Sequence, residues 1–189
     1  LASQIEGLYA DLYITVSEET HQELIQRLEE NHFKIKVIPA QGASHARREL
    51  LEFSMIESIS YFHYCDLDRF LTWLDHDREE LQRTVNKIAR SDYLIFGRTP
   101  RAMKTHPIEW IETEKLINTI FSLEFNQEVD AAAGSCGFSR ESAELILTHT
   151  KSEITDTEWP MIASRMGGLK VDYIEVEGLE YREEINRDI

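Results

Sequence analysis

The chain alternates short apolar runs with segments of helical periodicity, and this alternation is the feature that most limits its fold. The apolar runs lie at residues 9–17, 33–40, 60–65, 92–97 and 169–177. Helical patterns occupy residues 18–32, 44–58, 78–90, 108–125 and 140–150, and a further one opens at Thr155. Residues 130–138 predict a loop, and Ser44 is the expected cap of its helix. The alternation predicts an α/β fold with a mostly parallel central sheet flanked by helices.

The size and charge of the chain narrow the classes of protein to which it can belong. Its 189 residues, 42% of them hydrophobic, suffice for one core and are too few for two ordinary domains, so residues 1–189 predict a single domain. The net charge of -15 disfavours nonspecific binding to nucleic acid or anionic lipid. No apolar run approaches the roughly 18 residues of a membrane-spanning helix. With only two cysteines and no signal-peptide pattern, we expect a soluble cytoplasmic protein.

Two carboxylates follow the third apolar run. Asp66 and Asp68 come directly after "SYFHYC", at the carboxyl end of a predicted buried strand. Ligands of open α/β sheets bind at that edge, because the loops there vary while the sheet holds them rigidly. Two carboxylates separated by one residue can hold a hard divalent cation and leave positions open for phosphate oxygens. The pattern predicts a Mn²⁺ or Mg²⁺ site, although acidic triplets on solvated turns are also common in so acidic a chain.

The scarce cations lie at helix starts and just past strands. These positions are Arg47 and Arg48 after Ser44, Arg140 after Ser139, and Arg98, Arg101, Lys104 and His106 after the fourth apolar run. A helix N-terminus is partially positive and favours anions, so a bound phosphate would explain cations placed there. We therefore expect Arg47, Arg48, Arg98 and Arg140 on one side of the sheet near Asp66. The alternative is a set of solvated arginines that pair with the abundant glutamates.

Three segments of the sequence resemble nucleotide-diphospho-sugar glycosyltransferases of the GT-A fold. "ARRELLEFSMIESISYFHYCDLDR" is similar to their helix, strand and D-x-D motif, and "GSCGFSRESAELI" to their glycine-rich loop and the helix after it. "TDTEWPMIASRMGGLKVDYIEV" resembles their late acidic helix, glycine stop and strand. The order of these segments matches that of the family from about Gly42 to Val176. The resemblance implies a single Rossmann-like GT-A domain that moves a sugar from a nucleotide diphosphate donor to a hydroxyl acceptor.

The resemblance also implies roles for individual residues. Asp66 and Asp68 would hold Mn²⁺ or Mg²⁺. The nucleotide-sugar site would comprise Arg47, Arg48, Asp66, Arg69, Arg98, Arg101, Gly137, Ser139 and Arg140. Glu158 or Asp156 would be the catalytic base of an inverting transfer. "TDTE" also fits a capping box, in which Thr155 is the N-cap and Glu158 reaches back to it.

Other interpretations stay open at this stage. The usual first strand of the family and its Pro-x-Tyr-Asn type turn are absent from this sequence, so residues 9–20 could be the second strand of a divergent or N-terminally shortened member. A noncatalytic module that binds a nucleotide sugar or a protein would share the fold. A haloacid dehalogenase type phosphatase also begins with a strand and D-x-D, but near the start of its chain. His63 and Cys65 favour core packing over zinc, and Trp159 could pack in the core or contact a ligand.

Overall fold

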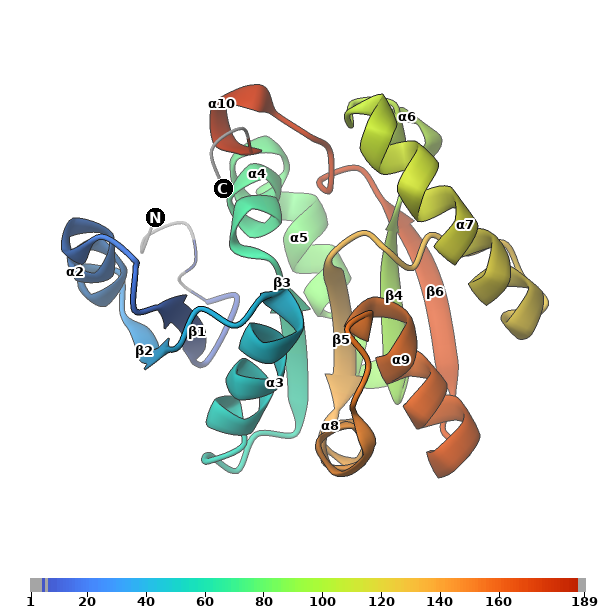
Figure 1. The fold of residues 1–189 in the computed structure, drawn as a ribbon, viewed down its shortest axis with the longest axis horizontal. Helices are drawn as coiled ribbons and strands as arrows, with labels where there is room; N and C mark the ends of the chain where they lie inside the picture. The colour runs from blue at the N-terminus through green and yellow to red at the C-terminus, as the bar shows by residue number, and fades with distance from the viewer. Residues whose placement is uncertain (1–4, 6, 187–189) are drawn as a thin grey trace.

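A computed structural model of the chain describes residues 5 and 7–186, and it has an α/β architecture (Figure 1). Its strands are β1 (Leu12–Ser17), β2 (Phe33–Ile38), β3 (Tyr61–Cys65), β4 (Tyr93–Arg98), β5 (Ser135–Ser139) and β6 (Val171–Val176). Its longer helices are α2 (Gln22–Glu30), α3 (Ala43–Ser54), α4 (Leu67–His76), α5 (Arg78–Val85), α7 (Ile108–Phe125), α8 (Arg140–His149) and α9 (Thr155–Met161). Short helical segments are η1 (Ile88–Arg90), α6 (Pro100–Met103), η2 (Ile162–Met166, a π-helical turn) and α10 (Glu183–Asn186).

The strands form two sheets. Strands β1 and β2 pair in parallel, and a four-stranded sheet has the order β3-β5-β4-β6. Strand β5 runs antiparallel to both of its neighbours, whereas β4 and β6 are parallel. The prediction of a mostly parallel central sheet is therefore wrong, because one reversed strand in the middle makes two of the three pairings antiparallel.

Strand β4 of the four-stranded sheet is buried on both faces, which explains why it is almost continuously apolar. Along β4, Tyr93 and Ile95 face the core that α3, α8 and α9 cover, while Leu94 and Phe96 face α4 and α5. This two-residue alternation is the pleat of a strand between two layers of helices. Figure 1 shows α8 and α9 in front of this sheet, with α4 and α5 behind it. Because β3 and β4 both run antiparallel to β5, their carboxyl ends lie at the same edge of the sheet.

The structure corrects two local predictions and adds one helix that was not predicted. The predicted loop at 130–138 contains most of β5, whose glycine and serines give little strand signal and whose place depends on two neighbouring strands. Helix α4 begins directly after Asp66, and its buried Phe70, Trp73 and Leu74 have the helical spacing that the sequence carried there. Ser44 does not cap α3, since Gly42 occupies the N-cap position and the Ser44 hydroxyl donates to the Glu153 carboxylate.

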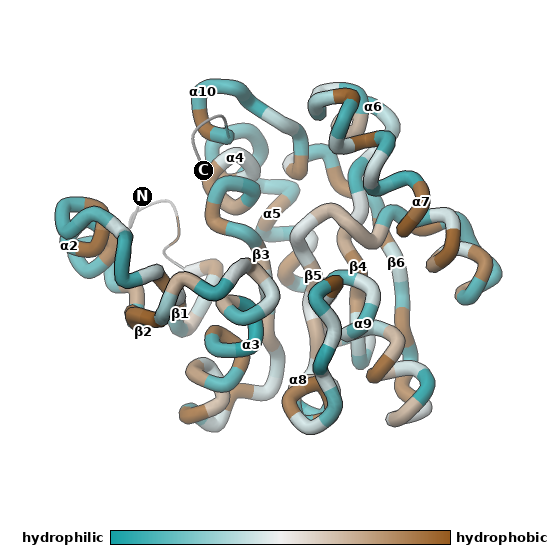
Figure 2. The backbone as a smooth tube through the Cα atoms, viewed as in Figure 1, coloured by the Kyte–Doolittle hydropathy of each residue, from teal (hydrophilic) through white to brown (hydrophobic). Residues whose placement is uncertain are grey.

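Helix α7 differs from the other helices because its own apolar side chains are not confined to the face that packs against the protein. Leu116, Ile120 and Leu123 are exposed on its outer side, while Phe121 is buried, and brown segments recur along α7 in Figure 2. Within the described range, every helix is too short or too polar to traverse a lipid bilayer.

Candidate functional site

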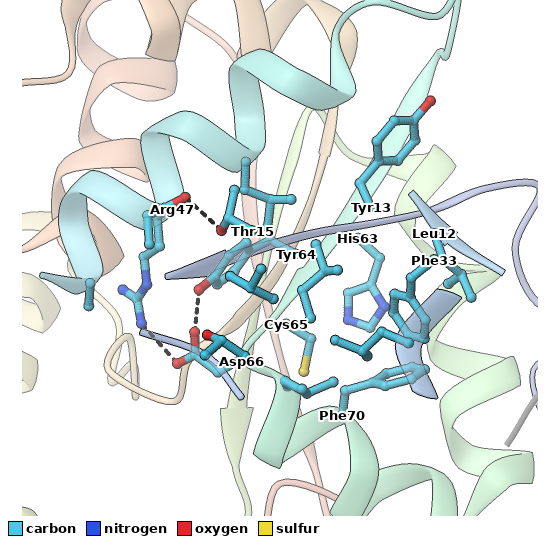
Figure 3. A pocket seen from close by; sticks show the side chains of 18 of the residues that line it. Leu12, Tyr13, Thr15, Phe33, Arg47, His63, Tyr64, Cys65, Asp66 and Phe70 are labelled. Atoms are coloured by element: carbon cyan, nitrogen blue, oxygen red, sulfur yellow. Dashed lines mark hydrogen bonds and ion pairs between the residues drawn. The ribbon is translucent and has the colours of Figure 1, made fainter. Parts of the chain in front are cut away.

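Asp66 lies at the carboxyl end of β3 and is held by two side chains, Arg47 of α3 and Tyr64 of β3 itself. Its Oδ2 accepts a hydrogen bond from Arg47 Nη2 of α3 at 2.9 Å, and its Oδ1 accepts one from the Tyr64 hydroxyl. Figure 3 shows the Arg47 and Tyr64 side chains directed toward the Asp66 carboxylate. The site thus begins with a carboxylate fixed at both oxygens.

Arg47 joins Asp66 to a second carboxylate, that of Asp156 in the first turn of α9. Arg47 Nη1 lies 2.5 Å from Asp156 Oδ2 and donates to Thr155 Oγ1 at 2.8 Å. The guanidinium also lies over the Tyr64 ring, 5.3 Å from its centroid. The side chains of Asp66 and Asp156 remain 34% and 22% exposed. We call Arg47, Asp66 and Asp156 the open cluster, because three distant segments meet in it while its carboxylates stay accessible.

Gly134 allows the loop before β5 to pass against Asp66. Its φ is +74°, a left-handed conformation that favours glycine, and a Cβ there would lie 2.5 Å from Asp66 Oδ2. The Gly134 carbonyl also accepts a hydrogen bond from the Asp66 backbone N–H at 3.0 Å. Any other residue at this position would displace either the loop or the carboxylate.

Burial raises the pKa of Asp66 above its ordinary value, although the charge of Arg47 opposes the shift. The negative charges of Asp156 and Asp68 also raise the pKa of Asp66, so the three carboxylates interact electrostatically. Asp68 lies in the first turn of α4, where it accepts a hydrogen bond from Asn186 Nδ2 at 2.7 Å. An added cation near Asp66 and Asp68 would relieve this repulsion.

Glu158, the other candidate for the catalytic base, does not take part in the open cluster and instead binds the loop before α9. Its carboxylate accepts hydrogen bonds from the Thr150 hydroxyl at 2.5 Å and from the backbone N–H groups of Lys151 and Ser152 at 2.7 and 2.8 Å. The predicted capping box is therefore wrong: Ile154 is the N-cap residue of α9, and Glu158 anchors the loop before it. Burial raises the pKa of Glu158, but these hydrogen bonds outweigh it and leave the pKa below its ordinary value.

Arg98 lies at the same edge of the sheet, at the carboxyl end of β4, but its side chain is buried. Its Nε and Nη2 donate to the Asp130 carboxylate at 2.8 and 2.9 Å, and Nη2 also contacts Glu114 at 2.5 Å. Asn118 and the Arg98 backbone N–H donate to Asp130 as well. The Arg98 side chain is 1% exposed. We call Arg98, Asp130 and Glu114 the closed cluster, since its charges are satisfied within the protein.

The remaining predicted arginines do not gather around Asp66. Arg101 is exposed and pairs with Glu177 and Glu180. Arg140 donates to the carbonyl oxygens of Met55, Glu57 and Ile59, beside the amino end of β3. The prediction that Arg140 lies near Asp66 is wrong because β5 is antiparallel, so the helix after it starts at the opposite edge of the sheet.

Two other predicted residues, Gly137 and Ser139, lie on β5, just before Arg140. Ser139 pairs in register with Tyr61 and caps α8 by accepting from the Ser142 N–H at 3.2 Å. A Cβ on Gly137 would lie 2.6 Å from Ile88 Cγ1, so the glycine is explained by close packing. Arg48 binds the Ser152 carbonyl and the Ser44 hydroxyl, which fixes the loop before α9. These residues have structural contacts that account for them.

Arg69 is buried beside Asp68, with its guanidinium 5.7 Å from the centroid of the Trp110 ring. Its Nη1 has no hydrogen-bond partner in the described part of the chain.

Trp159 is buried against Tyr64 and Phe138 and contributes to the core. His63 is hydrogen-bonded at both ring nitrogens, to Tyr9 and Ser135, and burial lowers its pKa to about 3.

Sequence reasoning did not identify Tyr64, Thr155 or Gly134 as site residues. Gly134 offered a usable signal, because it stands at the head of the predicted glycine-rich loop. Tyr64 and Thr155 offered none, since a tyrosine in a strand and a threonine at a helix start are ordinary. Comparison of the sequence with protein-family models and with curated proteins found no match.

Proposed function

We propose that this chain is a GT-A glycosyltransferase that binds a nucleotide sugar at the carboxyl edge of β3 and transfers the sugar to a hydroxyl acceptor. The observation that carries the proposal is the open cluster. The D-x-D aspartate Asp66 and the late acidic helix residue Asp156, 90 positions apart in the sequence, are joined through Arg47 at an accessible edge of the sheet. The resemblance assigns a role to each of the three residues of this cluster.

In the proposal, Asp66 and Asp68 hold Mn²⁺ or Mg²⁺. Among the residues described, no three His, Cys, Asp or Glu side chains gather as a metal site. Two carboxylates nevertheless fit these ions, because Mg²⁺ is commonly bound by one or two carboxylates together with phosphate oxygens. A cation held there would supply positive charge that offsets the charge on the diphosphate leaving group. Asn186 orients Asp68, and Tyr64 and Arg47 orient Asp66.

Asp156 is the better candidate for the catalytic base. In an inverting transfer the acceptor oxygen bonds to the anomeric carbon while the bond from that carbon to the diphosphate oxygen breaks. The nucleoside diphosphate leaves with the electron pair, and the base takes the acceptor proton. Arg47 holds the Asp156 carboxylate beside Asp66, whereas Glu158 accepts three hydrogen bonds from its own loop. A carboxylate so engaged is poorly available for a proton.

Calorimetric titration with a panel of nucleoside diphosphates, with and without Mn²⁺, tests the binding part of the proposal. We expect metal-dependent binding of at least one nucleotide and loss of that metal dependence in Asp68→Ala. The matched control is Asp75→Asn on the same helix, whose exposed carboxylate pairs with Arg182. Unchanged metal dependence in Asp68→Ala would overturn the metal assignment.

Turnover of a panel of nucleotide sugars tests the catalytic part. Asp156→Asn should lower the rate by about 100-fold or more while nucleotide binding persists, because an amide cannot accept the proton. Glu158→Gln should retain most of the activity. The opposite ranking would assign the base to Glu158. Metal-dependent binding with no turnover of any donor would favour the noncatalytic module instead.

A further inference from the structure

Arg47 already occupies the carboxylate that the proposed metal ion needs. Both oxygens of Asp66 are engaged, because Oδ2 accepts from Arg47 Nη2 at 2.9 Å and Oδ1 accepts from the Tyr64 hydroxyl. Figure 3 shows both contacts. An Mg²⁺ ion bound to Oδ2 at about 2.1 Å would lie within about 5 Å of Arg47 Nη2. Two cations so close repel each other, so a metal ion and the guanidinium compete for Asp66.

Arg47 cannot make way for a metal ion by losing its charge. Burial lowers the pKa of Arg47, but the neighbouring Tyr64, Asp66 and Asp156 outweigh this effect and hold that pKa above its ordinary value. The guanidinium therefore remains a cation across the physiological pH range. The competition is relieved only when the guanidinium moves away from Asp66.

The guanidinium is anchored so that it can turn without leaving the site. Nη1 lies 2.5 Å from Asp156 Oδ2 and donates to Thr155 Oγ1 at 2.8 Å, which ties Arg47 to α9. Nε is buried and has no hydrogen-bond partner among the described residues. Arg47 and Asp66 also line a cavity of about 380 Å³, shown in Figure 3, so there is open space beside the guanidinium.

Release from Asp66 would free one complete edge of the guanidinium. Nε and Nη2 lie on the same side of the planar group, and their parallel N–H donors match two oxygens of one phosphate. In the present structure Nη2 has an acceptor on Asp66, whereas Nε beside it has none in the described part of the chain. The edge that faces Asp66 is therefore the edge that a phosphate would satisfy in full.

We infer that Arg47 exchanges partners when substrate binds. It gives up Asp66 to a divalent cation and turns its freed Nε and Nη2 to the diphosphate that arrives with that cation. In the empty site Arg47 keeps the affinity for the metal low, so the cation and the diphosphate bind together. The inference rests on the proposed function, from which it takes the metal site, and adds that Arg47 controls when the metal binds.

Titration with Mn²⁺ alone, followed by electron paramagnetic resonance of the free ion, tests the competition. At mildly alkaline pH, Arg47→Met should bind Mn²⁺ about 10-fold more tightly than the wild type, because no cation then opposes the metal at Asp66. Asp66→Asn in the Arg47→Met background should abolish this gain. Equal affinity of the wild type and Arg47→Met for Mn²⁺ would overturn the inference.

The matched control for this titration is Arg48→Met, at the neighbouring position of α3. It removes the same charge, but Arg48 contacts the Ser152 carbonyl and the Ser44 hydroxyl instead of Asp66. The Mn²⁺ affinity should change by less than about 3-fold, since a charge that does not contact the metal site is screened by solvent. A gain as large as that of Arg47→Met would assign the effect to net charge and overturn the competition at Asp66.

Calorimetric titration with inorganic pyrophosphate at saturating Mn²⁺ tests the second half of the exchange. Arg47→Met should bind pyrophosphate about 10-fold or more weakly, because two N–H donors are lost. The same substitution thus strengthens binding of the metal alone and weakens binding of the diphosphate, whereas a general loss of structure would weaken both. Arg47→Lys keeps the charge without the planar pair of donors, so it should lose pyrophosphate affinity as well. Unchanged pyrophosphate affinity in both variants would overturn the exchange.

A measurement on the wild type keeps the inference testable if the variants do not fold. The Arg47 Nε–H signal in ¹H–¹⁵N NMR spectra should shift downfield when Mg²⁺ and pyrophosphate are added together, because Nε then gains an acceptor. An Nε–H signal that does not change while pyrophosphate binds would overturn the exchange and leave the proposed metal site standing. A wild type that binds no Mn²⁺, with or without pyrophosphate or any nucleoside diphosphate, would overturn the proposed function and this inference together.

Discussion

The open and closed clusters have the same composition, one arginine with two carboxylates, but the protein surrounds them differently. In the closed cluster, Arg98 is 1% exposed and Asp130 receives further hydrogen bonds from Asn118 and the backbone. In the open cluster, Asp66 and Asp156 keep 34% and 22% of their side-chain surface, and Arg47 Nε has no hydrogen-bond partner among the described residues. The Arg98–Asp130 pair is buried and fully hydrogen-bonded and so holds the fold together, although Glu114 beside it keeps 20% of its side-chain surface. An ion pair that is accessible and incompletely paired, like the open cluster, can exchange partners with a ligand.

The largest effect on stability is expected in the closed cluster. Arg98→Met should lower the free energy of unfolding by about 3–5 kcal/mol, because it leaves the Asp130 carboxylate buried without its cation. The matched control is Arg101→Met, whose exposed guanidinium pairs with Glu177 and Glu180 and which should cost under about 1 kcal/mol. Urea denaturation of both variants measures the difference. Similar costs would remove the distinction between buried and exposed pairs in this region.

A second comparison separates backbone strain from contact with the open cluster. Gly134→Ala and Gly168→Ala both force alanine into a left-handed φ, at +74° and +64°, which costs about 1–2 kcal/mol. Only Gly134→Ala also places a Cβ against Asp66, since a Cβ at Gly168 would have no described atom within 4 Å. We expect Gly134→Ala to cost about 1 kcal/mol more and to weaken nucleotide binding, which Gly168→Ala leaves unchanged. Equal thermal shifts and equal binding would show that Gly134 matters for its φ alone.

Replacement of Arg47 in the open cluster should lower stability less than replacement of Arg98 in the closed cluster. Arg47→Met should cost about 1–2 kcal/mol, because water can reach the carboxylates of Asp66 and Asp156 once the guanidinium is removed. Nucleotide binding, measured by calorimetry, should fall much more than stability does. A cost as large as that of Arg98→Met would identify the open cluster as a structural ion pair and weaken the case for a ligand site.

The smallest effect concerns the loop that supports Asp156. Glu158→Gln should lower the free energy of unfolding by about 1 kcal/mol at pH 7, because an amide replaces a charged acceptor of hydrogen bonds. The pKa of Glu158 lies below 4.5 in the folded protein, so the unfolded state binds the proton more readily. The greater stability of the wild type relative to Glu158→Gln is therefore present above pH 4.5, and it disappears as the pH falls through the pKa of Glu158 in the folded protein. A difference between the two proteins that does not change with pH would contradict the charged role of Glu158.

The sequence by itself determined the α/β class, the positions of β3 and β4, and the placement of Asp66 at a strand end. These features follow from local periodicity: a strand buried on both faces needs a continuous apolar run, and a helix that covers one face of a sheet needs apolar residues every three or four positions. Residues 60–65 and 92–97 carry the first pattern plainly. The family resemblance also marked Asp156 as one of two candidates for the catalytic base.

Only the tertiary structure decided which charged residues meet. Strand β5 has weak local signals and gains its place from β3 and β4, yet its reversed direction sends Arg140 to the far edge of the sheet. The choice between Asp156 and Glu158 depends on which side of α9 faces Arg47, and the enclosure of Arg98 depends on Asp130 arriving from a distant loop. Pairings between residues far apart in the sequence have no local period, so their physical basis exists only once the chain has folded.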